Sequence, residues 1–133
     1  MHMFKTVLFP IDRSSDSQAA AETVADLVKY CQSRLIILSV EDIDGSAGTP
    51  LSPEAVDQLL EQAKAGFAQL GITADTLHRQ GIVAFTICDV AEEVQADLII
   101  MGCRGISLTQ EGTNESVSNR VVNLSPCPVL IVP

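Results

Sequence analysis

The sequence Asp97-Leu-Ile-Ile-Met-Gly-Cys-Arg-Gly105 joins an apolar run to a turn that contains two glycines. Nine residues separate this turn from Glu115-Ser-Val-Ser118, and a second apolar run, Pro128-Val-Leu-Ile-Val132, follows. Apolar runs without alternation indicate strands that are covered on both faces, as in parallel sheets. The pattern predicts a strand, a glycine loop, a short helix and a strand, an order in which α/β folds hold nucleotide phosphates.

The rest of the chain alternates strands and helices in the same way. Apolar patterns predict strands at 5–12, 34–40, 72–78, 97–101 and 128–132, and the strand at 72–78 alternates, which places it nearer the sheet edge. Helices are predicted from a capping box at Ser15-x-x-Gln18, from Ser52-Pro53 to Gly71, after Gly81, and at 117–124. We therefore expect an α/β fold: an open, parallel, doubly wound five-stranded sheet with helices on both faces.

Composition limits the classes of function. The 133 residues, of which 47% are hydrophobic, predict a single domain spanning 1–133. A formal net charge of -9 argues against nucleic acid or an anionic membrane as partner. With neither a membrane-spanning run nor a signal pattern, we expect a cytoplasmic protein. No metal site or disulfide framework is predicted, because four cysteines are scattered without matching histidines: Cys31, Cys88, Cys103 and Cys127.

Three parts of the sequence together resemble the universal stress protein family. They are Val7-Leu-Phe-Pro-Ile-Asp12 with its serine-rich turn, Ala96 to Gly105, and Ser116-Val-Ser118 leading into Ser125 to Val132. The resemblance covers nearly the whole chain. It implies a Rossmann-like sandwich, of the kind found in adenine nucleotide alpha hydrolases, with strand order 3-2-1-4-5. It also implies a homodimer through the last strand, formed by Val129, Leu130, Ile131 and Val132.

The resemblance also implies a nucleotide site. ATP-binding members carry Gly-x-x-Gly, nine residues, and then Gly-Ser or Gly-Thr, so the ligand would be ATP or AMP, with Mg²⁺ accompanying ATP and no covalent cofactor. By this carry-over, Asp12 and Val40 would line the adenosine part of the pocket, and Pro10 belongs to the same set. The ribose and phosphates would meet Gly102 and Gly105, and the phosphates would also meet Ser116 and Val117.

One position departs from that pattern. Nine residues after Gly105 comes Glu115, where the ATP-binding pattern has glycine. A side chain there costs free energy if the backbone is left-handed, and a carboxylate near phosphates adds repulsion. Three hypotheses therefore stay open: a stress-response regulatory module that binds ATP or AMP, a dimeric protein-interaction module closed to nucleotide by Glu115, and slow ATP hydrolysis or self-phosphorylation at Ser116 or a loop threonine.

Other polar residues carry less weight. His78 is expected to be a solvated residue at a strand end, because nothing in the sequence pairs it with a nucleophile. Glu41, Asp42 and Asp44 are expected to form a solvated acidic run. No catalytic base is evident, so no catalytic residue is assigned, and the identity of a client protein does not follow from the sequence.

Overall fold

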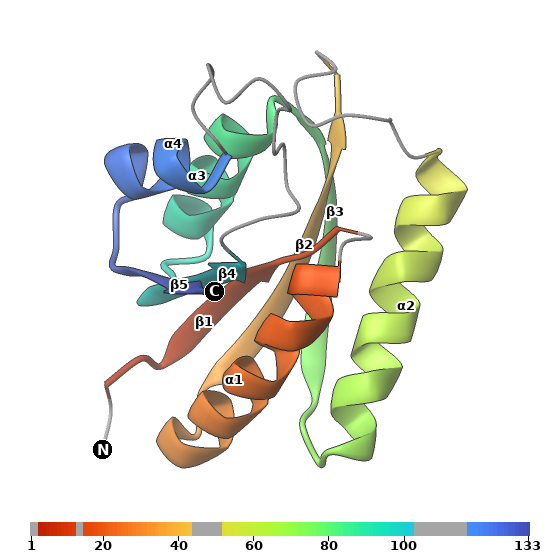
Figure 1. The fold of residues 1–133 in the computed structure, drawn as a ribbon, viewed down its shortest axis with the longest axis vertical. Coiled ribbons are helices and arrows are strands. Elements are labelled where there is room, and N and C mark those ends of the chain that lie inside the picture. The colour runs from red at the N-terminus through yellow and green to blue at the C-terminus, as the bar shows by residue number, and fades with distance from the viewer. Residues whose placement is uncertain (1–2, 13–14, 44–51, 103–116) are drawn as a thin grey trace.

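The computed structural model describes residues 3–12, 15–43, 52–102 and 117–133, with the backbone alone for 15–18. Five parallel strands form one sheet in the order β3-β2-β1-β4-β5: β1 (Thr6–Pro10), β2 (Arg34–Asp42), β3 (Ala74–Gly81), β4 (Leu98–Gly102) and β5 (Val129–Val132). The helices between them are α1 (Ser15–Cys31), α2 (Pro53–Gln69), α3 (Val83–Glu93) and α4 (Val117–Leu124) (Figure 1). The predicted fold class and strand order are confirmed.

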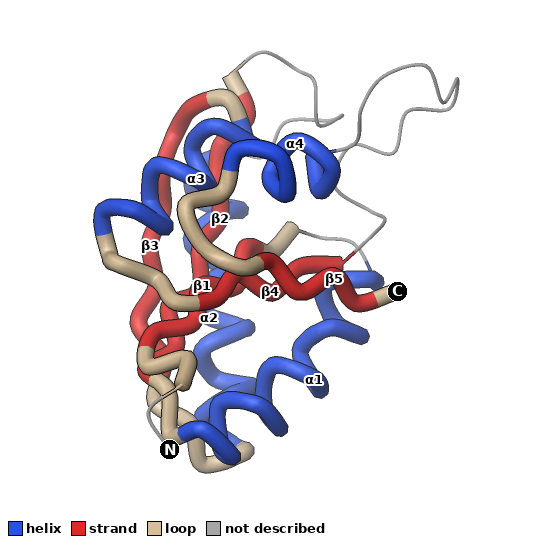
Figure 2. The backbone as a smooth tube through the Cα atoms, turned by 90° about the vertical axis from the view of Figure 1, so that its left-hand side faces the viewer, coloured by secondary structure: helices blue, strands red, loops and turns tan. Residues whose placement is uncertain are grey.

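The sheet separates two apolar cores. In Figure 2, α3 and α4 lie on one side of the strands and α1 and α2 lie on the other. Because successive strand residues point to opposite faces, Val7 and Phe9 pack in the core under α1 and α2, whereas Leu8 packs in the core under α3 and α4. All three side chains are at most 1% exposed. Burial on both faces explains why the central strands are uninterrupted apolar runs.

Several strand boundaries differ from the sequence prediction by a few residues, and those of β2 and β3 have an identifiable cause. β2 continues past Val40 into the acidic residues, because it pairs with β3 as far as Asp42, which lies opposite Gly81. β3 begins at Ala74, two residues later than predicted, because the preceding residues close the end of α2. There Gly71 adopts φ of 82°, its N–H donates to the Ala68 carbonyl, and Ile72 donates to Phe67.

The helix starts are largely as predicted. Ser52 caps α2, accepting a hydrogen bond of 3.1 Å from the backbone N–H of Ala55, and Pro53 occupies the first helical position. α1 begins at Ser15 itself, so Ser15 is the first helical residue and not the residue before the helix. In the described part of the chain, no helix is long and apolar enough to span a membrane.

The edge strand β3 carries charged side chains that pair within the chain. The guanidinium of Arg34, at the start of β2, lies 3.0 Å from the Asp75 carboxylate, and that of Arg79 lies 3.2 Å from Glu93 on α3. All four side chains are more than a third exposed, so each pair contributes about 1 kcal/mol or less to stability. Their charges mark the β3 edge of the sheet as polar.

Candidate functional site

The residues predicted to hold adenosine lie at the carboxyl ends of β1 and β2. Pro10 is the last residue of β1 and lies opposite Leu38 of β2. The N–H of Ile11 still donates to the Leu38 carbonyl at 2.8 Å, so the two chains continue side by side. Two residues further along, Asp12 therefore reaches the level of Val40. Both residues are partly exposed, as a binding role requires.

Two of the predicted phosphate-binding residues, Gly102 and Val117, are described by the structure, and they lie on the other side of β1. Leu8 is paired with Ile99 of β4, which brings the carboxyl end of β4, at Gly102, close to the level of Pro10. Sequence order reverses between β1 and β4, and such a point in an open sheet is where ligands bind. Val117 begins α4, is 4% exposed and packs in the core under α3 and α4. A helix start offers backbone N–H donors and the positive end of the helix dipole to an anion.

The remaining predicted site residues are Gly105 and Ser116, and both lie outside the described residues. The same is true of Glu115, on which the question of nucleotide binding depends. The described part of the site thus has five residues, which the fold brings to the carboxyl ends of the strands: Pro10, Asp12, Val40, Gly102 and Val117.

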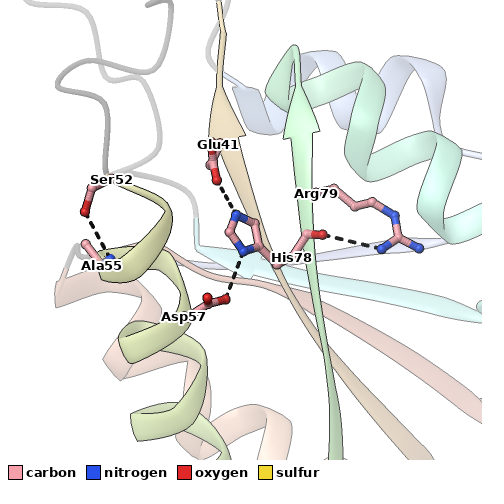
Figure 3. A network of polar contacts seen from close by, with 6 residues as sticks. All are labelled: Glu41, Ser52, Ala55, Asp57, His78 and Arg79. Atoms are coloured by element: carbon pink, nitrogen blue, oxygen red, sulfur yellow. Dashed lines mark hydrogen bonds and ion pairs between the residues drawn. The ribbon is translucent and has the colours of Figure 1, made fainter.

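A polar cluster of His78, Glu41 and Asp57 lies near the carboxyl ends of β2 and β3 and corrects two sequence-based expectations. His78 lies within β3, its side chain is 25% exposed, and both ring nitrogens face carboxylates. Nε2 lies 2.5 Å from Glu41 of β2, and Nδ1 lies 2.9 Å from Asp57 near the start of α2 (Figure 3). The prediction of a solvated His78 is therefore wrong, and so is that of a solvated Glu41, whose side chain is 17% exposed. Of the other two acidic residues, Asp42 is partly buried and Asp44 lies outside the described residues.

This cluster favours a protonated imidazole. Burial by itself lowers the pKa of His78, but the hydrogen bonds and negative charges of Asp57 and Glu41 together outweigh it, so the pKa is raised above 6.5. Only the imidazolium form has an N–H for each carboxylate. The carboxylates approach opposite nitrogens, an arrangement that joins β2, β3 and α2. Among the described residues, no three His, Cys, Asp or Glu side chains are placed to hold a metal ion.

We expect the stability contributed by His78 to depend on pH. A raised folded-state pKa means that the native state binds the proton more tightly, so the contribution is complete below pH 6.5 and is lost as the pH rises through the folded pKa. Replacing His78 by glutamine should lower the free energy of unfolding by about 1–2 kcal/mol at about pH 5.5 and by less than about 0.5 kcal/mol at about pH 9. Urea denaturation at both pH values measures this difference.

Asp75→Asn is the matched control, because Asp75 also lies on β3 but pairs with Arg34 instead of His78. Its effect should be the same at both pH values. An equal effect of His78→Gln at both pH values would contradict the assignment of an imidazolium between two carboxylates.

Comparison with known proteins agrees with the fold. The model of the universal stress protein family matches residues 3–133. A universal stress protein of Synechocystis is 60% identical over 136 aligned residues, covering 98% of this chain and 87% of that protein. The universal stress protein YxiE of Bacillus subtilis is 35% identical, with coverage of 98% and 99%.

Solved structures share the fold. That of the protein MJ0577 of Methanocaldococcus jannaschii is 26% identical, with a TM-score of 0.78 and coverage of 98% and 96%. A universal stress protein solved in complex with cyclic AMP is 22% identical, with a TM-score of 0.80 and coverage of 98% of each chain, a level of identity that establishes the shared fold. The match of the family model and the alignment with curated relatives over nearly the full length lead to one conclusion: this chain belongs to the universal stress protein family.

Proposed function

We propose that this protein is a cytoplasmic stress-response regulatory module. It binds ATP or AMP at the carboxyl ends of strands β1, β2 and β4. The observation that carries the proposal is the meeting of Asp12, Val40 and Gly102 at the point where strand order reverses, beside the start of α4. In this proposal Asp12 offers a carboxylate to the adenosine, Val40 lines the same part of the pocket, and the glycine loop with the start of α4 suits phosphates.

The chemistry of the site supports binding without rapid turnover. The described part of the site has a single carboxylate, that of Asp12, and no nucleophile beside a base. In the proposed complex, Gly105, Ser116 and Val117 contact the phosphates, and Mg²⁺ accompanies ATP. The same fold holds cyclic AMP in one related protein, which is consistent with an adenine nucleotide as ligand. The nucleotide then acts as a conformational signal to a client protein.

Calorimetric titration with ATP and AMP at millimolar concentrations tests this proposal. We expect saturable binding that weakens about tenfold in Asp12→Ala, because a hydrogen bond to a charged group contributes about 1.5 kcal/mol or more. Asp26→Ala is the control, since Asp26 is an exposed aspartate on α1. Absence of heat with both nucleotides, together with no competition against a labelled nucleotide, would remove nucleotide sensing from the function.

A second function is favoured by one residue. Glu115 stands where ATP-binding members carry glycine, and a closed phosphate site would leave an interaction module that binds no nucleotide. In both versions we propose a homodimer through β5, an edge strand of four apolar residues. Each version assigns a different cause to stress regulation: nucleotide occupancy in the first, and protein contacts alone in the second.

A further inference from the structure

A groove of about 520 Å³ lies between α1 and α2, over the middle of the sheet. It exists because the two helices cover different strands: α1 packs on β4 and β5, whereas α2 packs on β2 and β3. Strand β1 and the residue that follows its end therefore form the floor, through Phe9 and Ile11. One wall is the stripe of α2 residues between 59 and 70, and Ala21 of α1 lies on the other side.

Small residues on α2 keep this groove open. Gly66 lies within the helix, where glycine costs stability relative to alanine. A Cβ added at Gly66 would meet no atom within 4 Å, so no close packing explains the glycine. One turn earlier, Ala63 is also small and lines the same groove. The helix thus presents a hollow apolar stripe where larger side chains would have closed the space.

The groove is separate from the candidate nucleotide site. Phe9 and Ile11 belong to the core under α1 and α2, whereas Val40 and Val117 pack with the core under α3 and α4. The sheet lies between these two sets of side chains. Asp12 is the exception, because it follows Ile11 at the strand end and also lines the groove.

One end of the groove is polar, and the rest of its lining is mostly apolar. His78 lies opposite Ser39 in the sheet and bonds Asp57, which places the start of α2 at the level where β1 ends. Asp12 therefore lies at the end of the groove nearest the start of α2. Away from that end, the Phe67 ring meets the Phe9 ring edge-on at a centroid distance of 6.1 Å. The groove lining on α2 runs from Leu59 to Leu70, which follows the last helical residue, and eleven steps of helical rise extend over about 16 Å.

We propose that this groove binds a small amphiphile with one aliphatic chain and a cationic amino head group. The chain lies along the α2 stripe over Phe9 and Phe67, and the ammonium group donates hydrogen bonds to the Asp12 carboxylate. The volume is within the range of small-molecule sites, which are mostly apolar with few polar groups. Charge selects the head group: the Asp12 carboxylate attracts an ammonium group and repels a negatively charged head group placed at the same end of the groove.

Titration of the full chain with decylamine, decanol and decanoate below their micellar concentrations tests the proposal. We expect one molecule of decylamine to bind per chain, about tenfold more tightly than decanol, with decanoate weaker still. Asp12→Asn should make the affinities for decylamine and decanol similar. Gly66→Leu should fill the groove and lower decylamine affinity at least about tenfold, while the melting temperature stays equal or rises because the helix loses a glycine.

Ala68→Leu is the matched control, since Ala68 is an exposed residue outside the groove lining on the same helix. It should bind decylamine as the unchanged protein does. Equal binding of decylamine and decanoate, or undiminished binding by Gly66→Leu, would overturn the proposal. Gly66 does not belong to the proposed nucleotide site, so ATP titration of Gly66→Leu separates a failure of this inference from a failure of the proposed function.

Discussion

Replacing Glu115 by glycine is expected to strengthen ATP binding by about ten- to a thousandfold. Two contributions produce this range. A residue with a Cβ in left-handed backbone costs about 1–2 kcal/mol, a cost that glycine avoids. A carboxylate at about 6 Å from a phosphate charge adds roughly 0.7–3 kcal/mol of repulsion for each charge pair, depending on the effective dielectric constant.

The contributions are separated by Glu115→Gln, which removes the charge and keeps the Cβ. If repulsion dominates, glutamine recovers most of the gain that glycine gives, and the gain shrinks at high salt. If the backbone dominates, only glycine strengthens binding. Calorimetry with ATP and with AMP measures both variants, and ATP, which carries more phosphate charge, should gain more from loss of the carboxylate. Unchanged ATP affinity in both variants would mean that Glu115 does not oppose the nucleotide.

A lysine in place of Leu130 is expected to convert the proposed homodimer into a monomer. Leu130 lies in β5 at the sheet edge and is 36% exposed, so its free surface is available to a second copy. In a two-fold dimer each substitution occurs twice, and two lysines near the axis would face each other. Lost apolar burial and like-charge repulsion together should weaken the proposed dimer by roughly 2–4 kcal/mol, about thirty- to a thousandfold in the dissociation constant.

Sedimentation or light scattering at micromolar concentration measures this change, with a mass near 14.2 kDa expected for the variant and twice that mass for the unchanged protein. Leu70→Lys is the control, because Leu70 is 47% exposed and follows α2. That helix packs on β2 and β3, at the end of the sheet away from β5. A monomeric mass for the unchanged protein would remove β5 as a dimer interface at this concentration.

Periodicity predicted the fold well because the central strands are buried on both faces. The runs at 5–12 and 97–101 have no polar interruption, and they became β1 and β4 with ends shifted by one or two residues. β3 was harder, because a strand at the edge needs fewer apolar residues and its start depends on how α2 ends. The hydrogen bonds of Gly71 and Ile72 decide that start, and they are set by backbone geometry after the helix.

The candidate site was predicted in part. Strand ends in a parallel sheet share one edge, so the placement of Asp12, Val40 and Gly102 follows from the order of elements together with the family resemblance. The bonding of His78 could not be predicted in this way. It depends on the register of β3 against β2 and on which turn of α2 faces the sheet, and neither leaves a local sequence signal. The groove beside Gly66 likewise arises from how two helices divide the strands between them.

The charged edge of β3 bears on how the protein assembles. A sheet with two unpaired edge strands can add copies at both edges and grow into a fibre. A sheet in which one edge strand alone can pair forms a closed dimer. On β3, Asp75 and Arg79 are held in ion pairs with Arg34 and Glu93, so a strand that joined this edge would place its own side chains among four charges. If the proposed homodimer forms through β5, the charges on β3 would oppose further addition at the other edge and hold the assembly at two copies.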